Sequence, residues 1–182
     1  ALRTGRNHHN AGVGYQADFP IGFPGYAGRF SPEAASIAQV LRLNGYNTAM
    51  FGKHHNVPAG ETSAAGPFDM WPTGIGFEHF YGFIGGSTDQ WHPLLYRGTS
   101  RVAEEPGVPD ALDYRLASEA IDWLHNQKSA ASAKPFFLYL AHNMCHVPLF
   151  VSDKFKGKTE RGLFGDVIEE IDWSVGEVMS AL

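Results

Sequence analysis

A continuous apolar run at residues 135–141, Pro-Phe-Phe-Leu-Tyr-Leu-Ala, constrains the fold of this chain more than any other feature. The run is shorter than a typical helix, and it lies between a linker of small residues and the polar segment that starts at His142. An uninterrupted apolar strand of this length is buried on both faces, as in parallel sheets that are covered by helices. The sequence therefore predicts an α/β fold with a buried, parallel strand over 135–141.

A helix and a second strand are predicted before this run. Ser31-Pro32-Glu33 offers an N-cap, a proline suited to the first helical position and an acid in the first turn, so we expect the helix to begin at Ser31. Asn44-Gly45 predicts its end. Residues 46–51 follow as a short strand that leads into Gly-Lys-His-His, and the three segments together form an αβ unit.

The rest of the chain is predicted to hold one long irregular segment and two helices. Residues 56–109 are rich in glycine, proline and aromatic residues, and a loop of this length is usually functional. One helix is expected from Asp110 to about Lys128 and another from about Leu163. In the last helix we expect an apolar face opposite a solvated acidic one; the apolar set is Phe164, Ile168, Ile171, Val175, Val178 and Leu182, and the acidic set is Asp166, Glu169, Glu170, Asp172 and Glu177.

Composition excludes several classes of function. The chain has 182 residues, 43% of them hydrophobic, which is enough for one domain with a core. Its net charge of −5 without a basic cluster argues against a nucleic-acid partner. No apolar run approaches the roughly 18 residues of a membrane span. The single cysteine, Cys145, excludes an internal disulfide.

Both predicted strands end in polar residues that can bind an anion. Lys53 and His55 follow the first strand, and His146 follows the second. Ligands of open α/β sheets bind beyond the carboxyl ends of the strands, so the two ends converge if the strands are neighbours. A lysine with two imidazoles suits an oxyanionic substrate, because it combines a fixed positive charge with groups that carry protons. Ordinary loop residues remain the alternative interpretation.

Two other chemistries fit the same segment less well. His142 and His146 have the four-residue spacing of metal ligands on a helix, but they follow a strand and Pro148 comes next, so we do not expect zinc here. Cys145 and His146 are adjacent in extended chain and should point to opposite sides, which disfavours a nucleophile–base pair. We interpret Cys145 as a small, buried apolar residue.

Three motifs carry a resemblance to a known family. Residues 2–6, Leu-Arg-Thr-Gly-Arg, are similar to the end of the signature Cys/Ser-x-Pro-x-Arg-x-x-Leu-x-Thr-Gly. Residues 45–55 are similar to Gly-Tyr-x-Thr-x-x-x-Gly-Lys-x-His, and residues 135–148 to a Pro-Phe-Phe-Leu-Tyr strand followed by His-x-Pro. With these motifs the chain resembles the formylglycine-dependent sulfatases, the arylsulfatase family of the alkaline phosphatase superfamily. Arg3 departs from the pattern, which prefers an apolar residue there, and His54 stands at a position that is usually aromatic or large.

The resemblance implies the architecture of an incomplete domain. We expect an α/β fold, a partial alkaline phosphatase-like sandwich with a mixed, mostly parallel central sheet flanked by helices. Residues 1–182 would form an incomplete N-terminal catalytic domain, truncated at both ends, because Leu182 falls inside a helical pattern and no leader precedes Ala1. The chain is thus expected to be an internal fragment of a longer sulfatase.

The resemblance also implies an activity and a role for each candidate residue. The parent would hydrolyse sulfate monoesters, small-molecule or glycan, through a formylglycine hydrate beside a calcium ion. Lys53 matches the lysine that contacts sulfate, and His55 the histidine that takes a proton as sulfate is expelled. His146 matches the histidine near the leaving-group oxygen, where it binds substrate and acts as a general acid.

Formylglycine and the calcium ligands are expected upstream of Ala1 and downstream of Leu182, with no metal ligand in this chain. We therefore expect the piece to be inactive alone. Two alternatives stay open: a phosphonate monoester hydrolase or phosphodiesterase of the same superfamily, and a non-catalytic binding module derived from a sulfatase. The family suggests an extracytoplasmic or lysosomal location, while the compartment and the oligomeric state stay unknown.

Overall fold

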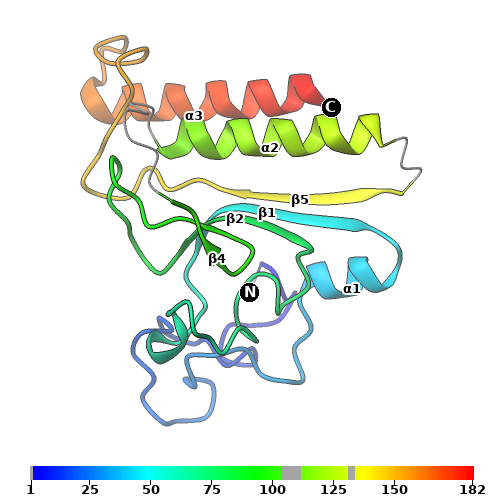
Figure 1. Ribbon diagram of the computed structural model, residues 1–182. Coiled ribbons are helices and arrows are strands. Elements are labelled where there is room, and N and C mark those ends of the chain that lie inside the picture. Colours follow the sequence, from blue (N-terminus) through cyan, green and yellow to red (C-terminus); the bar gives the residue numbers. More distant parts are fainter. Residues whose placement is uncertain (1, 104–111, 131–133) are drawn as a thin grey trace.

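A five-stranded sheet forms the centre of the computed structural model, which describes residues 2–103, 112–130 and 134–182 (Figure 1). The strands are β1 (Asn47–His54), β2 (His79–Ile84), β3 (Tyr96–Arg97), β4 (Ser100–Arg101) and β5 (Phe136–Ala141), in the spatial order β4-β3-β2-β1-β5. The three long strands are parallel, with β1 between β2 and β5, whereas β3 and β4 add an antiparallel edge. The predicted α/β class with a mixed sheet flanked by helices is confirmed.

Helices and loops cover both faces of this sheet. Helices α2 (Leu112–Ser129) and α3 (Gly162–Ala181) lie side by side above it in Figure 1, while α1 (Ile37–Leu43) and the N-terminal loops lie below, with the short 3-10 helix η1 (Ala59–Glu61). Residues of β1 alternate between the two layers. Met50 packs with the core on the α1 side, and Phe51 with the core on the α2 side, which explains why the central strand is apolar at successive positions.

The parallel pairing of β1 and β5, which the candidate site requires, is present. Residues 47–52 pair with 136–141, and Gly52 lies opposite Ala141. The backbones approach so closely here that a Cβ on Gly52 would lie 1.9 Å from the carbonyl oxygen of Ala141, and Gly52 has a φ of 103°. Glycine is therefore required at this position. The carboxyl ends of both strands, where the predicted site residues lie, therefore face the same side of the sheet.

Helix α1 begins later than predicted. Ser36, not Ser31, is its N-cap: Ser36 Oγ accepts a hydrogen bond from Gln39 N (3.0 Å), and Gln39 Oε1 accepts one from Ser36 N (2.8 Å). This capping box satisfies two backbone donors at once. Ser31 instead begins a turn, in which its carbonyl accepts a hydrogen bond from Ala34 N. The proline at position 32 suits that turn as well as it suits a helix.

The prediction of one irregular segment over 56–109 is wrong for its middle part, because β2 lies there and pairs with β1. Gly82 interrupts the strand pattern in the sequence and so conceals it. In the structure this glycine is needed, because a Cβ on Gly82 would lie 2.0 Å from the carbonyl oxygen of Gly52.

The two later helices occur where they were predicted, but the buried face of α3 is wrong. The expected start of α2 at Asp110 lies outside the described residues. In α3, Asp166 is 2% exposed and Glu170 is 5% exposed, whereas Phe164 is 55% exposed. The carboxylate of Asp166 accepts hydrogen bonds from two backbone amides of the loop before α3, and that of Glu170 accepts one from Ser152 N. Covering these acids with a loop offsets the cost of burying them.

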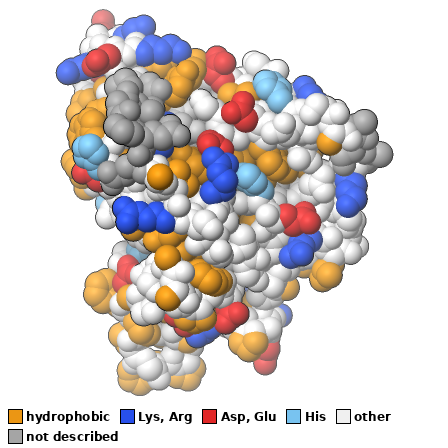
Figure 2. Space-filling view, in the orientation of Figure 1, with side chains coloured by type: hydrophobic (Ala, Val, Ile, Leu, Met, Phe, Trp, Pro, Cys, Tyr) orange, Lys and Arg blue, Asp and Glu red, His pale blue; other side chains and the backbone are white. Residues whose placement is uncertain are grey.

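On the face shown in Figure 2, basic and acidic side chains are interspersed and do not gather by sign. Within the described ranges, no helix combines the length and the apolar character needed to cross a membrane.

Candidate functional site

Lys53 lies near the end of β1 as a cation with no counter-ion among the described residues. It pairs in register with Phe83 of β2, and its side chain is half-buried. Among the described residues it makes no hydrogen bond and no ion pair. Burial lowers the pKa of the Lys53 ammonium, because desolvation disfavours its charged form. An anion bound beside Lys53 would relieve this cost.

His55 follows β1 and is held from two sides. Its Nε2 contacts Oδ2 of Asp18, a residue of the N-terminal loop that the sequence did not single out. Gly86, just after β2, lies against the ring: a Cβ at this position would be 2.7 Å from His55 Cε1. The orientation of the His55 ring is thereby restricted.

His54, between these two residues, belongs to a buried network. Its Nδ1 lies 2.8 Å from Arg3 Nη1, and its Nε2 lies 2.9 Å from the carbonyl oxygen of Met70. A carbonyl only accepts, so Nε2 carries the proton and Nδ1 accepts from Arg3. Complete burial, with the nearby Arg3 charge, lowers the pKa of His54 to about 3, so this histidine is neutral. Arg3 also hydrogen-bonds Asn56 Oδ1. Arg3 and His54, which both depart from the family pattern, contact each other.

His146 lies in the loop that follows β5. Its ring is exposed, and Nδ1 is 2.7 Å from the carbonyl oxygen of Val147. Because that acceptor requires a proton on Nδ1, Nε2 is left free. In the described part of the chain His146 makes no hydrogen bond to Lys53 or His55. The structure therefore places the three residues at the carboxyl ends of the neighbouring strands β1 and β5, with no described hydrogen bond from His146 to the other two.

Asp113 of α2 anchors the loop after β5. It is buried, and its carboxylate accepts hydrogen bonds from Asn143 N (2.8 Å) and Met144 N (3.0 Å). His142 Nδ1 lies 3.7 Å from the same carboxylate. No sequence pattern indicated this contact, because Asp113 lies thirty residues before Asn143, in a helix. Residues 142–146 are non-helical, as expected, so His142 and His146 lack helical ligand spacing.

The prediction for Cys145 is wrong. The thiol is exposed, because the turn that Asp113 anchors directs Cys145 away from the core. Across the described ranges, no group of three His, Cys, Asp or Glu residues could hold a metal ion. The described side chains therefore do not by themselves fit the calcium site that the resemblance implies.

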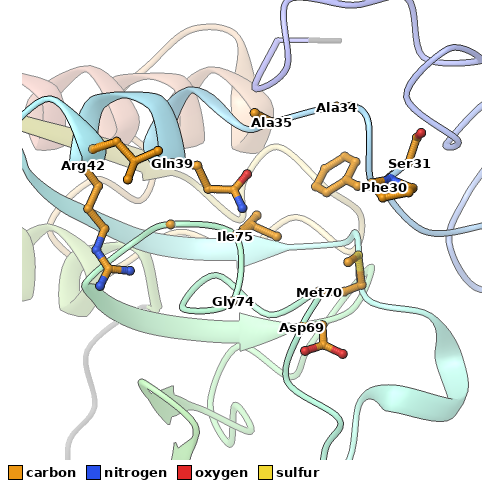
Figure 3. Close-up of a pocket in the computed structure, with 13 residues that line it drawn as sticks. Phe30, Ser31, Ala34, Ala35, Gln39, Arg42, Asp69, Met70, Gly74 and Ile75 are labelled. Carbon is orange, nitrogen blue, oxygen red and sulfur yellow. The ribbon is translucent and has the colours of Figure 1, made fainter.

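A cavity of about 640 Å³ lies between α1, the segment that precedes α1 and the segment before β2. Figure 3 shows Gln39 and Arg42 of α1 on one side, with Asp69 and Met70 on the other. None of the predicted site residues lines it. The candidate site at the carboxyl ends of β1 and β5 is therefore separate from this cavity.

Comparisons with known proteins agree on one family. The Sulfatase family model matches residues 1–182. Arylsulfatase A of Homo sapiens is 30% identical over 199 aligned positions, which cover 100% of this chain and 38% of that protein. An arylsulfatase of Klebsiella aerogenes is 30% identical over 177 positions, covering 88% of this chain and 36% of its own length. The chain thus spans less than half the length of these relatives.

Solved structures show the same fold. The crystal structure of Ps i-CgsB in complex with k-i-k-neocarrahexaose has a TM-score of 0.80 and 23% identity, over 100% of this chain and 43% of that one. A sulfatase from Pseudoalteromonas sp. has a TM-score of 0.71 and 20% identity, over 100% and 40% of the two chains. The similarity of folds matches the alkaline phosphatase-like sandwich expected from the motifs. Because the family model matches its whole length, the chain belongs to the sulfatase family.

Proposed function

We propose that the protein containing this chain is a sulfuric ester hydrolase, and that Lys53, His55 and His146 form part of its sulfate pocket. The observation that carries the proposal is the half-buried Lys53 at the end of β1, a cation that pairs with no acid of the described chain. A sulfate monoester carries one negative charge and accepts hydrogen bonds at several oxygens, so it matches an ammonium flanked by imidazoles. Residues 1–182 would be the incomplete N-terminal part of the catalytic domain.

Each residue has a role that follows from its position. Lys53 would bind the sulfate oxygens and stabilise charge in the transition state. His55 would accept a proton through Nδ1, because Nε2 is engaged by Asp18. His146 would act as an imidazolium with protons on both nitrogens: Nδ1 donates to the Val147 carbonyl, and Nε2 would give its proton to the leaving-group oxygen, which leaves a neutral imidazole.

The family implies two further groups, a formylglycine and a calcium ion, which would supply the nucleophile and neutralise the sulfate. Both are proposed to come from parts of the protein beyond residues 1–182. The chain alone is therefore expected not to hydrolyse 4-nitrophenyl sulfate, with or without calcium.

The substrate class is proposed as a sulfate ester of a small molecule or a glycan. Relatives are named for both: a human steryl-sulfatase is 36% identical over 81 residues, and a canine N-acetylgalactosamine-6-sulfatase is 44% identical over 64 residues. The Ps i-CgsB structure holds a neocarrahexaose, a carbohydrate.

The test uses the full-length protein that contains this chain and two substrates, 4-nitrophenyl sulfate and an alkyl sulfate. Lys53→Ala should reduce both substrate affinity and kcat, because it removes charge from the ground state and the transition state alike. His146→Ala should slow the alkyl sulfate far more than the nitrophenyl ester, whose leaving group hardly needs a proton. His125→Ala, an exposed histidine on α2, serves as the control and should leave turnover unchanged.

Two results would overturn these assignments. Equal slowing of both esters by His146→Ala would remove the general-acid role. Hydrolysis of a phosphonate monoester in strong preference to both sulfates would replace the sulfatase assignment with the phosphonate hydrolase alternative.

A further inference from the structure

We propose that Asp18 is a positioning residue for His55: its carboxylate fixes the tautomer of the imidazole so that Nδ1 keeps a free lone pair. The sequence motifs do not include Asp18, and the roles proposed above use its contact with His55 without assigning Asp18 a role of its own. The tautomer follows from the geometry alone. Its consequence for turnover depends on the proposed function, in which His55 accepts a proton.

The contact itself determines the tautomer. Oδ2 of Asp18 meets Nε2 of His55, and both side chains are partly buried, at 33% and 21% exposure. An ionised carboxylate only accepts hydrogen bonds, so the proton of a neutral imidazole must lie on Nε2. Nδ1 then carries the lone pair, and no described residue hydrogen-bonds it.

The backbone around Asp18 keeps the carboxylate in place. Ala17, the preceding residue, is 1% exposed, and a Cβ on Gly28 would lie 2.9 Å from its carbonyl oxygen. Gly28 N in turn donates to Gly12 O (3.1 Å), which ties two parts of the N-terminal loop together. Asp18 therefore approaches His55 from a backbone that is anchored at the buried Ala17.

A second contact confines the ring at Cε1. Gly86 leaves room for His55 that any larger residue would fill, since a Cβ there would lie 2.7 Å from Cε1 and 3.2 Å from both Nδ1 and Nε2. Gly86 and Asp18 together restrict the orientation of the ring. A partly exposed pair of this kind contributes little to stability, generally below about 1 kcal/mol even when both groups are charged, so the value of this contact lies in orientation.

Orientation of this kind has a chemical consequence. Under the proposed function, the remaining hydroxyl of the sulfated nucleophile would give its proton to Nδ1 of His55; its O–H electron pair would close a carbonyl, and sulfate would leave with the pair of the broken C–O bond. The imidazolium that results carries protons on both nitrogens, and the Asp18 carboxylate stabilises it through Nε2. In serine hydrolases an aspartate likewise orients the catalytic histidine and stabilises its imidazolium.

The first experiment measures the tautomer in this chain by ¹⁵N NMR of the histidine rings above pH 7.5, with His55 assigned by the loss of its signals in His55→Gln. In the wild type we expect the proton on Nε2. Asp18→Asn replaces an acceptor with an amide that can donate to Nε2, so the proton should move to Nδ1. Asp69→Asn, which alters an exposed acid that lines the separate cavity, should leave the His55 tautomer unchanged.

The second experiment measures turnover of 4-nitrophenyl sulfate by the full-length protein. Asp18→Asn should reduce kcat by about 10-fold or more, within the roughly 10²–10⁴-fold that general-base catalysis contributes. Nitrophenol should appear as a burst followed by a slower steady state, because the affected step follows departure of the phenol. Combining Asp18→Asn with His55→Ala should cause no loss beyond that of His55→Ala alone, since both act on one step.

The outcomes separate this inference from the proposed function. A wild-type His55 with its proton on Nδ1, or a tautomer that Asp18→Asn leaves unchanged, would overturn the inference whatever the enzyme does. A tautomer change in a protein that hydrolyses no sulfate ester would support the Asp18 contact and overturn the proposed function. A tautomer change without any effect on kcat would overturn the role of Asp18 in turnover.

Discussion

Burial of His54 should make the stability of this chain depend steeply on pH. The imidazole is fully buried, accepts a hydrogen bond from Arg3 and donates one to the Met70 carbonyl, and its pKa falls to about 3. In the unfolded chain a histidine titrates near 6.5. Between these values the unfolded state binds a proton that the folded state does not, so the free energy of unfolding decreases as pH falls from about 6.5 toward about 3.

The size of the effect follows from the two pKa values. At pH 5 the unfolded His54 is almost fully protonated and the folded one is not, which corresponds to a loss of about 2 kcal/mol relative to pH 7.5. The limiting loss near pH 3 is roughly 5 kcal/mol. Other groups titrate in the same range, so the prediction concerns the difference between the wild type and His54→Gln. The glutamine can still accept from Arg3 and donate to Met70, but it does not titrate.

Urea unfolding, followed by the fluorescence of the buried Trp71, would measure this difference. Between pH 7.5 and pH 5 the wild type should lose about 2 kcal/mol more than His54→Gln, while His125→Gln should behave like the wild type. Equal losses in the wild type and His54→Gln would refute the reasoning. A His54 ring signal that titrates near pH 6.5 in the folded chain would refute it independently.

Further predictions concern backbone contacts and the loop on α3. Gly52→Ala should destabilise the chain by more than about 2 kcal/mol, because the new Cβ would clash with Ala141 O, whereas Gly176→Ala in open space on α3 should stabilise it by about 0.5–1 kcal/mol. Asp166→Ala should lower the melting temperature by several degrees, because it removes the acceptor of two backbone amides, while Asp172→Ala on the exposed face should not. An unchanged melting temperature in Asp166→Ala would show that the loop holds without the carboxylate.

Prediction from the sequence was correct where a single pattern dominated a segment. The apolar run at 135–141 predicted β5, and the two polar strand ends predicted that Lys53 and His146 leave the sheet at one edge. It failed where two local signals competed. Ser31 and Ser36 are both suitable N-caps, and only the capping box with Gln39 distinguishes them. Gly82 weakened the strand pattern of β2 because its role is to admit a neighbouring backbone.

The error in α3 has a different cause. Hydrophobic periodicity assumes that acids face water, yet Asp166 and Glu170 are buried by a loop whose backbone amides they accept. A hydrogen bond between a helix carboxylate and a loop amide leaves no periodic pattern in the sequence. Asp113 and Asp18 were missed for the same reason, because each acts on a segment far away in the sequence.

The contacts at the end of β1 distinguish Lys53 from its neighbours. The three residues after Lys53 each contact the N-terminal segment. Arg3 hydrogen-bonds His54 and Asn56, and Asp18 contacts His55. These contacts fix the backbone on which Lys53 stands and occupy the polar groups around it. Lys53 alone keeps a charge with no partner in the described chain. This combination of a restrained strand end and one unpaired cation is the physical basis on which we propose that the site binds the sulfate group.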